Sequence, residues 1–510
     1  MTCLLVYPPP AYLSAFPFPY FPSMSPYSFT GKRVVILGLA RQGLALARFL
    51  VAEGAQVTLS DAAPADQLTA PLAELAGLPV RVVPGGHPLE LLEDCDLLCL
   101  SGGVPPQIPF AGAARRQGIP LSNDALLTMA LSPTPVWGIT GSSGKTTTTT
   151  LVGLMLQAHA VTQHPAPTVW VGGNIGVPLI DKLAAIGPTD QMVLELSSFQ
   201  LELFNTENGG EARSPHGAAI LNITPNHLDR HPSMAHYAAA KANIVRWQQP
   251  ADVAVLGADD ALTGAWLRSG RVQITAEAGQ PAVDFPLAAR RLGFGLQQPH
   301  GEGCWLSADG SALVLRLDGR EQTLLPISTV LLRGRHNLLN IAAACIISAA
   351  AGATPAVMAE VARTFRGVAH RLELVRQQAG VRWINDSIAT APERAAAALR
   401  SFSEPIIWLA GGRDKHLPWD EISRLAQQRV RRAVLFGEAA GLIAAALHVA
   451  APDLPVILCR DLDQAVAAAA QAAQPGDVVL LSPGGTSYDA YKDFAARGDH
   501  FRALVEALSS

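Results

Sequence analysis

One stretch, from Trp137 to Thr147, constrains the fold of this chain most. Val136 and Trp137 are typical of the end of a buried strand, glycines that permit a tight turn follow, and a run of threonines can open a helix. A strand, turn and helix in this order aim several backbone N–H groups at an anion. Lys145 adds a positive charge for a polyphosphate, and the Thr146 hydroxyl can ligate Mg²⁺. We therefore predict a phosphate-binding loop; the alternative is a glycine-serine turn beside a surface lysine.

Length and composition set the number of domains. A chain of 510 residues is long enough for about three domains of ordinary size. Its net charge of −4, with 16% charged residues, gives no basic surface for a nucleic acid. Its six cysteines show neither a metal-ligand spacing nor a disulfide framework, which favours a reducing cytoplasm. We predict domains at 31–133, 134–366 and 367–510.

The first thirty residues differ from the rest of the chain. Residues 1–31 contain seven prolines and no charged side chain. The prolines argue against a membrane helix, and the basic start of a signal peptide is missing. Two interpretations stay open, a disordered extension over residues 1–30 or an upstream start codon with Met24 as the true start.

The first domain begins like a dinucleotide-binding fold. A buried strand (34–37), a glycine turn (38–43), an amphipathic helix (44–51) and a second strand (56–59) follow one another, and Asp61 is placed like a ribose-binding acid. Ala40 replaces the middle glycine of the fingerprint, which argues against a tightly packed dinucleotide pyrophosphate but allows a uridine nucleotide. A purely structural role stays open. A further strand is predicted at 97–100, and Pro133 and Pro135 mark the linker into the next domain.

The central domain places polar side chains after successive predicted strands. The strand 191–195 ends in Glu195, as in phosphate-loop enzymes that hold Mg²⁺, and Ser197 can cap the next helix. The strand 218–223 leads to His227, and Lys241 lies on a predicted helix, where periodicity alone makes it a surface lysine. Without further information, Glu195 could be a solvated rim residue and His227 a structural hydrogen-bonding group.

Five segments together resemble the Mur ligase family, and within it the enzymes that add glutamate. These segments are Thr140–Thr147, Gly172–Gly176, Glu195–Glu202, Asn222–Arg230 and Asn385–Ser387. The resemblance extends from about Gly31 to the C-terminus, and Glu195–Glu202 is its most specific part. It implies an α/β fold with a Rossmann-like nucleotide-binding domain, a central phosphate-loop ATPase domain with a mainly parallel sheet, and a C-terminal Rossmann-like domain.

The resemblance also implies a reaction. It is that of an ATP-dependent, ADP-forming ligase that joins D-glutamate to UDP-N-acetylmuramoyl-L-alanine during peptidoglycan precursor synthesis, and so serves cell shape and division. ATP phosphorylates the substrate carboxylate, and the amine of glutamate attacks the acyl phosphate. Two Mg²⁺ ions would offset the charge between the anions. We expect a cytoplasmic monomer without a nucleic-acid partner or a membrane span.

Site residues are carried over from the same resemblance. Catalytic roles fall to Lys145, His227 and Lys241; ATP would contact Gly141, Ser142, Ser143, Gly144, Lys145, Thr146, Thr147, Asn340, Arg371 and Asp386; the metals would contact Thr146, Glu195, His227 and Lys241; the other substrates would contact Asn174, Thr390, Lys415, Ser487 and Phe494. Lys241 would be carbamylated, because a free lysine is cationic and repels Mg²⁺. Asn340 as a helix cap and Lys241 as a solvated lysine remain alternatives.

The sequence pattern of the third domain predicts a second doubly wound fold. Strands are predicted at 406–410, 434–437 and 478–481, with helices between them, after a strand that ends near Asp386. Two departures from the family stand out. Ile388 occupies a position where the family commonly has lysine, and Ala62 and Ala63 follow Asp61 where polar uracil contacts are expected.

Other functions stay open at this point. The chain could be a sister ligase that adds L-glutamate or another amino acid, or a folylpolyglutamate-type ligase. From a different class, it could be a switch protein that binds ATP to control a partner. A switch would not need Glu195, His227, Lys241 and a glutamate-like pocket together.

Overall fold

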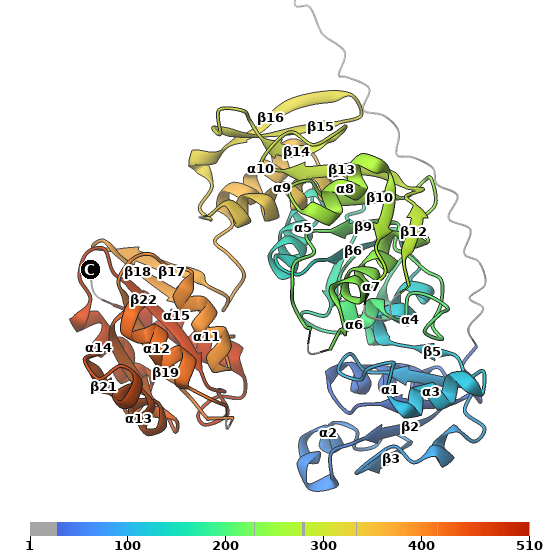
Figure 1. Ribbon diagram of the computed structural model, residues 1–510, viewed down its shortest axis with the longest axis horizontal. Helices are drawn as coiled ribbons and strands as arrows, with labels where there is room; N and C mark the ends of the chain where they lie inside the picture. Colours follow the sequence, from blue (N-terminus) through green and yellow to red (C-terminus); the bar gives the residue numbers. More distant parts are fainter. Residues whose placement is uncertain (1–27, 229, 278–280, 333, 416, 509–510) are drawn as a thin grey trace, which may run out of the picture. The chain divides into compact units, whose positions relative to one another are not determined.

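The computed structural model describes residues 28–228, 230–277, 281–332, 334–415 and 417–508. Three large sheets carry the fold (Figure 1). The chain forms two compact units: one comprises the N-terminal residues up to 137 with 172–216 and 239–248, and the other comprises 138–171, 217–238 and the chain from 249 onward. The segment 1–27, together with Asp229 and Arg333 of two motifs, lies outside the described residues.

The N-terminal sheet is parallel, in the order β3-β2-β1-β4-β5. Its strands are β1 (Arg33–Leu37), β2 (Gln56–Asp61), β3 (Val80–Pro84), β4 (Leu97–Leu100) and β5 (Leu121–Ser122), and its helical segments are α1 (Arg41–Ala52), η1 (Ala65–Gln67), α2 (Thr69–Glu74), η2 (Leu89–Leu92), α3 (Pro109–Arg116) and α4 (Asp124–Leu131). The strand order reverses at β1, which places the turn between β1 and α1 where α/β proteins bind nucleotides. The predicted Rossmann-like opening is confirmed.

The central sheet has nine strands, in the order β16-β15-β14-β13-β10-β9-β6-β8-β7. They are β6 (Val136–Thr140), β7 (Val169–Gly173), β8 (Gln191–Glu195), β9 (Gly217–Ile220), β10 (Val253–Gly257), β13 (Arg290–Gly295), β14 (Gly303–Leu306), β15 (Ala312–Leu317) and β16 (Arg320–Pro326). The β14–β15 and β15–β16 pairs are antiparallel, whereas the β9–β10, β10–β13 and β13–β14 pairs are parallel.

Helices and a small hairpin complete the central region. They are α5 (Lys145–Ala160), η3 (Ile180–Ala185), α6 (Ser198–Leu201), α7 (Met234–Arg246), α8 (Ala261–Ser269), η4 (Ile327–Thr329), α9 (Arg335–Ala350) and α10 (Pro355–Thr364), with β11 (Arg271–Ile274) antiparallel to β12 (Val283–Pro286). α5, α9 and α10 pack against one another, and α9 also packs on β13. This packing brings the first turn of α5 close to the N-terminal half of α9.

The C-terminal sheet has the order β17-β18-β22-β19-β20-β21, in which β17 alone is antiparallel to its neighbour. Its elements are β17 (Glu373–Gln378), β18 (Val381–Asn385), α11 (Pro392–Arg400), β19 (Ile406–Gly411), α12 (Asp420–Arg429), β20 (Val430–Phe436), α13 (Ala440–Ala450), β21 (Val456–Leu458), α14 (Leu462–Ala472), β22 (Val478–Gly484) and α15 (Phe494–Glu506). One apolar core joins the sheet to α11, α12 and α13, and another joins its opposite face to α14 and α15. Both faces are covered, as doubly wound sheets require.

The bounds of two strands of the central sheet differ from the predictions. The strand predicted at 218–223 ends at Ile220, because the Ile223 N–H donates to Asp260 Oδ2 (3.0 Å). β6 runs on to Thr140, so that the phosphate turn begins only at Gly141. In the described part of the chain, no helix is both long enough and apolar enough to cross a bilayer.

Candidate active site

The predicted phosphate loop connects β6 to α5. Gly144 occupies the N-cap of this 16-residue helix with a φ of 80°, a conformation that favours glycine. The Lys145 ammonium group donates to the carbonyl oxygens of Gly141 (2.8 Å) and Ser142 (3.2 Å). The helix N-terminus and this lysine have the positive polarity that a polyphosphate requires, and the phosphate contact itself stays a prediction.

Three residues outside the loop fix its shape. The Ser143 N–H donates to Asn222 Oδ1 (2.9 Å), and the Ser142 hydroxyl donates to the Thr224 carbonyl (2.9 Å). The Tyr237 hydroxyl also donates to the Ser142 hydroxyl oxygen (3.1 Å), and the Tyr237 ring is buried. Sequence reasoning missed this role of Tyr237, because only the fold brings α7 to the loop.

Asn340 and Arg371 contact the beginning of α5. Asn340 is buried on α9, and its Oδ1 occupies the space that a Cβ on Gly144 would fill. The Arg371 guanidinium donates from Nη1 to the Thr146 hydroxyl oxygen (3.2 Å). The structure therefore brings together Lys145, Thr146, Asn340 and Arg371, which the sequence assigned to one nucleotide.

Glu195 lies at the end of β8 and is 1% exposed. Its Oε1 accepts from Asn174 Nδ2 (2.9 Å), and the Asn174 N–H donates to the Glu195 carbonyl (2.9 Å). A Cβ on Gly173 would overlap that carbonyl, and the φ of Gly173 is 97°, so this close approach requires glycine. Within the described residues, Glu195 Oε2 is buried without a hydrogen-bond partner.

A buried carboxylate oxygen without a partner is costly unless a cation or water meets it. Carboxylates are also the oxygen ligands that Mg²⁺ prefers. Glu195 therefore fits the predicted metal role, and the interpretation of Glu195 as a solvated rim residue is wrong. Ser197 forms the predicted cap of α6, with Gln200 completing a capping box.

His227 and Lys241 occupy contrasting surroundings. His227 is exposed in a left-handed conformation, with a φ of 54°, and its ring centroid lies 6.5 Å from that of Tyr237. Non-glycine residues adopt this conformation rarely, mostly in turns or at functional sites. Lys241 is 1% exposed and follows Tyr237 by one turn of α7. The surface-lysine alternative for Lys241 is therefore wrong.

In the N-terminal domain, the Asp61 carboxylate already accepts two backbone hydrogen bonds. Leu39 N–H donates to Oδ2 (2.7 Å), and Ala63 N–H donates to Oδ1 (2.9 Å). Asp61 thus fixes the turn between β1 and α1, while its contact with a ribose stays a prediction. Arg41, which sequence reasoning missed, donates from Nη1 to the Gly176 carbonyl (2.5 Å) and from Nη2 to the Asn174 carbonyl (3.2 Å).

Asp386 follows β18 and is 5% exposed. Burial raises its pKa to about 7, although hydrogen bonds from the Ser482 hydroxyl (2.9 Å) and the Leu372 N–H (3.2 Å) favour the charged form. Arg371 and Arg394 act in the same direction as those hydrogen bonds. The carboxyl group therefore changes its charge near neutral pH.

Two of the four side chains predicted to form the amino-acid pocket, Lys415 and Thr390, approach each other in the structure. Lys415 Nζ lies 3.5 Å from the Thr390 hydroxyl, and burial, together with Arg394, lowers the pKa of Lys415. Ser487 is buried, and Phe494 begins α15 with a partly exposed ring. A pocket that also includes Ser487 and Phe494, with Lys415 supplying the positive charge, stays a prediction.

Arg497, which sequence reasoning missed, joins the loop after β18 to the loop after β22. It is fully buried on α15 and donates to Ser387 Oγ (3.0 Å) and to the carbonyls of Ser387 (2.9 Å), Gly485 (3.2 Å) and Thr486 (3.1 Å). Burial lowers its pKa to about 10. Only its spacing of three residues from Phe494 on one helix could have suggested that both face the same loops.

The chain is similar to known proteins over nearly all of its described length. Models described as "Mur ligase MurD-like, N-terminal domain", "Mur ligase middle domain" and "Mur ligase, glutamate ligase domain" match residues 32–123, 139–348 and 370–485. A protein named UDP-N-acetylmuramoylalanine--D-glutamate ligase from Symbiobacterium thermophilum is 42% identical over 94% of this chain and 98% of its own length. Its namesake from Pelotomaculum thermopropionicum is 39% identical over 94% and 98%. A crystal structure of UDP-N-acetylmuramate-alanine ligase MurC from Thermotoga maritima covers 93% of this chain and 99% of its own, at 19% identity and a TM-score of 0.48.

Proposed function

The chain belongs to the Mur ligase family, and from this premise we propose that it joins D-glutamate to UDP-N-acetylmuramoyl-L-alanine at the expense of ATP. One geometric observation supports the proposal most directly. At the first turn of α5, the structure brings together Lys145, Thr146, Asn340 and Arg371. Three relatives that are 39% to 42% identical to this chain carry the name of the D-glutamate ligase. The product would be a precursor of peptidoglycan, made in the cytoplasm by a monomer.

The proposed reaction has two steps. A carboxylate oxygen of the alanyl end attacks the γ-phosphorus of ATP, and the bond to ADP breaks to give an acyl phosphate. The unprotonated amine of glutamate then attacks the acyl carbon, phosphate leaves, and the nitrogen loses a proton. Lys145 and Arg371 would hold the phosphate oxygens and stabilise negative charge as it builds there.

The metal site fits Mg²⁺ at Glu195. The unpartnered, buried Oε2 of Glu195 supports this assignment. By the family resemblance, Thr146 would hold this first Mg²⁺ together with Glu195, and His227 and Lys241 would belong to the second. When bound, Mg²⁺ would offset the repulsion between the phosphate and the substrate carboxylate. Asn174 holds the other oxygen of Glu195 and so orients the carboxylate.

We propose that Lys241 acts as a carbamate. Reaction of its amine with CO₂ replaces a cation by an anion with two oxygens, which can approach a metal. Its burial on α7 supports this role, because a lysine that serves only solubility stays in water. Tyr237 precedes Lys241 by four residues, so both side chains leave the same side of α7. The Tyr237 hydroxyl donates a hydrogen bond to Ser142 on that side.

The amino-acid pocket is proposed to use Lys415, Thr390, Ser487 and Phe494. Since Ile388 is apolar, Lys415 is the candidate cation for a carboxylate of glutamate. The D configuration follows from the names of the relatives. The UDP moiety is assigned to the turn between β1 and α1, with Asn174 contacting the sugar.

Phosphate release tests the proposal directly. We expect the full chain, with ATP and Mg²⁺, to release phosphate only when UDP-N-acetylmuramoyl-L-alanine and D-glutamate are both present. Equal or faster release with L-glutamate would identify a sister ligase. Binding of ATP without release in any combination would identify a switch protein and overturn the ligase.

A further inference from the structure

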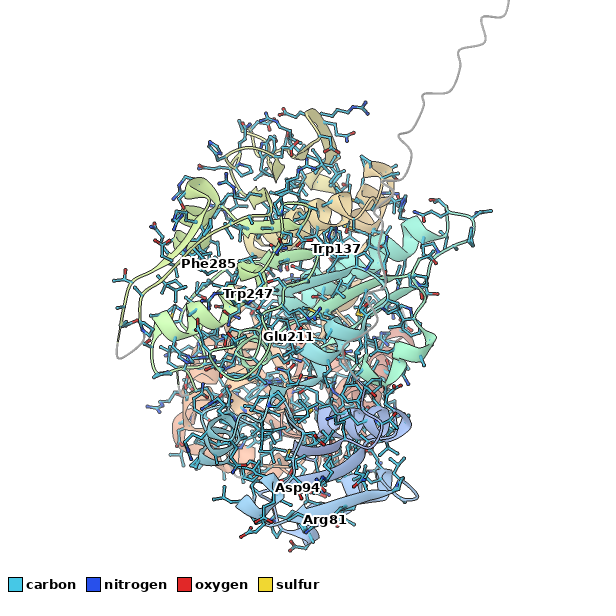
Figure 2. All side chains as sticks on the ribbon, turned by 90° about the vertical axis from the view of Figure 1, so that its right-hand side faces the viewer. Arg81, Asp94, Trp137, Glu211, Trp247 and Phe285 are labelled. Carbon is cyan, nitrogen blue, oxygen red and sulfur yellow. The ribbon has the colours of Figure 1, made fainter. Side chains whose placement is uncertain are left out.

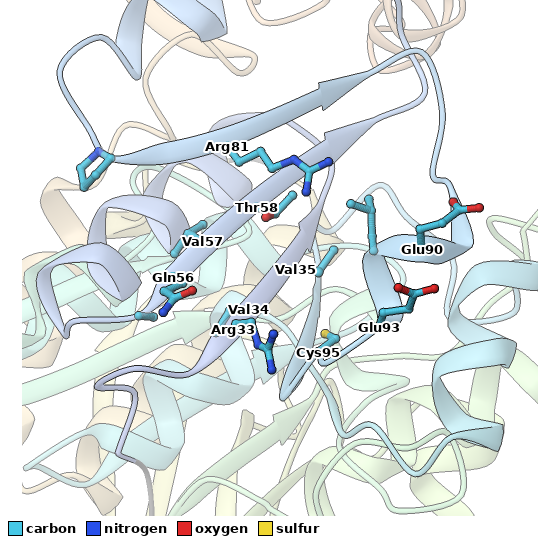
Figure 3. Close-up of a pocket in the computed structure, with 13 residues that line it drawn as sticks. Arg33, Val34, Val35, Gln56, Val57, Thr58, Arg81, Glu90, Glu93 and Cys95 are labelled. Carbon is cyan, nitrogen blue, oxygen red and sulfur yellow. The ribbon is translucent and has the colours of Figure 1, made fainter.

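The N-terminal sheet carries a cavity that lies apart from the turn proposed to bind the substrate. It has a volume of about 530 Å³ and is lined by β1, β2 and β3 and by the segment around η2 (Figure 3). Its strand residues include Arg33 and Gln56, the first residues of β1 and β2. The proposed nucleotide turn follows the other ends of these strands, so the two sites are separate.

The short connection between β3 and β4 explains the cavity. Parallel sheets normally have both faces covered by crossover helices, but this crossover contains only the four-residue η2. The exposed face presents Arg33 and Gln56, which are paired neighbours, and Thr58 beside Arg81. The lining of the cavity therefore combines polar and apolar side chains, and it offers a hydroxyl and an amide for hydrogen bonds.

Charges of both signs line this cavity. Arg33 and Arg81 come from the strands, whereas Glu90 and Glu93 come from the η2 segment (Figure 3). Arg33 pairs with Asp94 (2.8 Å), and both Arg81 and Asp94 belong to the N-terminal domain drawn in blue in Figure 2. Arg81, Glu90 and Glu93 form no ion pair with any residue that the structure describes.

We propose that this cavity binds a short peptide with a free ammonium end and a free carboxylate end. Arg81 would receive the carboxylate, with Arg33 adding positive charge although it is paired with Asp94, and Glu90 and Glu93 would receive the ammonium group. A nucleotide would meet repulsion from both glutamates, and a polycation would meet repulsion from both arginines. The volume lies in the range of ordinary small-ligand sites and exceeds the needs of a single amino acid. Backbone amides of the peptide suit Thr58 and Gln56.

Titration calorimetry with trialanine tests the proposal. We expect saturable binding to the full chain, and at least tenfold weaker binding of N-acetyl-trialanine and of trialanine amide. Arg81→Gln and Glu93→Gln should each weaken trialanine binding by a similar factor. Arg116→Gln and Glu53→Gln, which remove exposed charges of the same domain outside the cavity, should leave it unchanged.

Cys95 gives a second readout, because it lines the cavity and is partly exposed. Trialanine should slow the labelling of Cys95 by a maleimide and leave that of Cys459, in the C-terminal domain, unchanged. No binding up to ten millimolar trialanine, or equal binding of the blocked peptides, would overturn the proposal. Ligase activity of Arg81→Gln should match that of the unaltered chain, so the test stands apart from the proposed function.

Discussion

Asp386→Asn should make the C-terminal domain less sensitive to pH. The pKa of Asp386 rises from an ordinary 3.8 to about 7 because its carboxyl group is buried. A carboxyl group whose pKa is higher in the folded state makes its full contribution to stability at pH values below its unfolded-state pKa. This contribution is lost as the pH rises toward the folded-state pKa. The asparagine side chain keeps the shape, can accept from the Leu372 N–H and can donate to Ser482 Oγ.

The size of the effect follows from linkage. Stability falls by about 1.4 kcal/mol for each pH unit between the two pKa values. Between pH 5 and pH 8 the unaltered chain should therefore lose roughly 2–3 kcal/mol of local stability, on the order of a hundredfold in the opening equilibrium. The asparagine variant should not show this loss, because it has no charge to bury.

Hydrogen exchange measured by mass spectrometry suits a chain of several domains, for which a single unfolding midpoint is not defined. Peptides covering β18 and β22 report on Asp386, whose own N–H bonds to the Leu481 carbonyl (2.7 Å). The comparison is made between variant and unaltered chain at each pH, which removes the intrinsic pH dependence of exchange. Asp453→Asn, which changes an exposed carboxylate of the same domain, is the matched control. Parallel pH profiles for Asp386→Asn and the unaltered chain would refute the reasoning.

Four further predictions concern the reaction itself. Lys145→Ala should abolish phosphate release, since the polyphosphate loses a charge-assisted contact; unchanged turnover would remove the phosphate-loop assignment. Glu195→Gln should raise the Mg²⁺ concentration needed for half-maximal activity at least tenfold, as a carboxylate ligand becomes a neutral amide; an unaltered Mg²⁺ dependence would exclude Glu195 as a ligand. Lys241→Ala and Lys241→Arg should both be nearly inactive, and a small carboxylic acid should partly restore the alanine variant; full activity of Lys241→Ala at saturating Mg²⁺ would exclude the carbamate. Lys415→Ala should raise the KM for glutamate at least tenfold and leave that for ATP nearly unchanged; equal effects on both substrates would count against the pocket.

The sequence predicted those parts of the site that depend on neighbouring residues. The phosphate loop, Glu195 at the end of its strand and the Ser197 cap are local patterns, in which a few adjacent residues determine the conformation. Strands 97–100 and 191–195 were correct to the residue because short apolar runs with clear ends form them.

The residues that sequence reasoning missed act across long separations. Tyr237 reaches Ser142 from 95 positions away, and Arg497 reaches Ser387 from 110 positions away. A tyrosine or an arginine on a helix has no local pattern that distinguishes a solvated side chain from a buried one that joins two loops. The periodicity of α7 failed for Lys241 for the same reason, because this helix is buried along most of its length.

Asn174 links the start of α1 to the Glu195 carboxylate. Asn174 offers its backbone carbonyl to the Arg41 guanidinium (3.2 Å) and its side-chain amide to Glu195 Oε1 (2.9 Å). Its backbone N–H is in turn held by the Glu195 carbonyl (2.9 Å), so Asn174 cannot rotate without disturbing both partners. Arg41 begins α1, immediately after the turn to which the UDP moiety is assigned. The Arg41 guanidinium, Asn174 and the Glu195 carboxylate therefore form one continuous chain of hydrogen bonds, in which Asn174 is the shared residue.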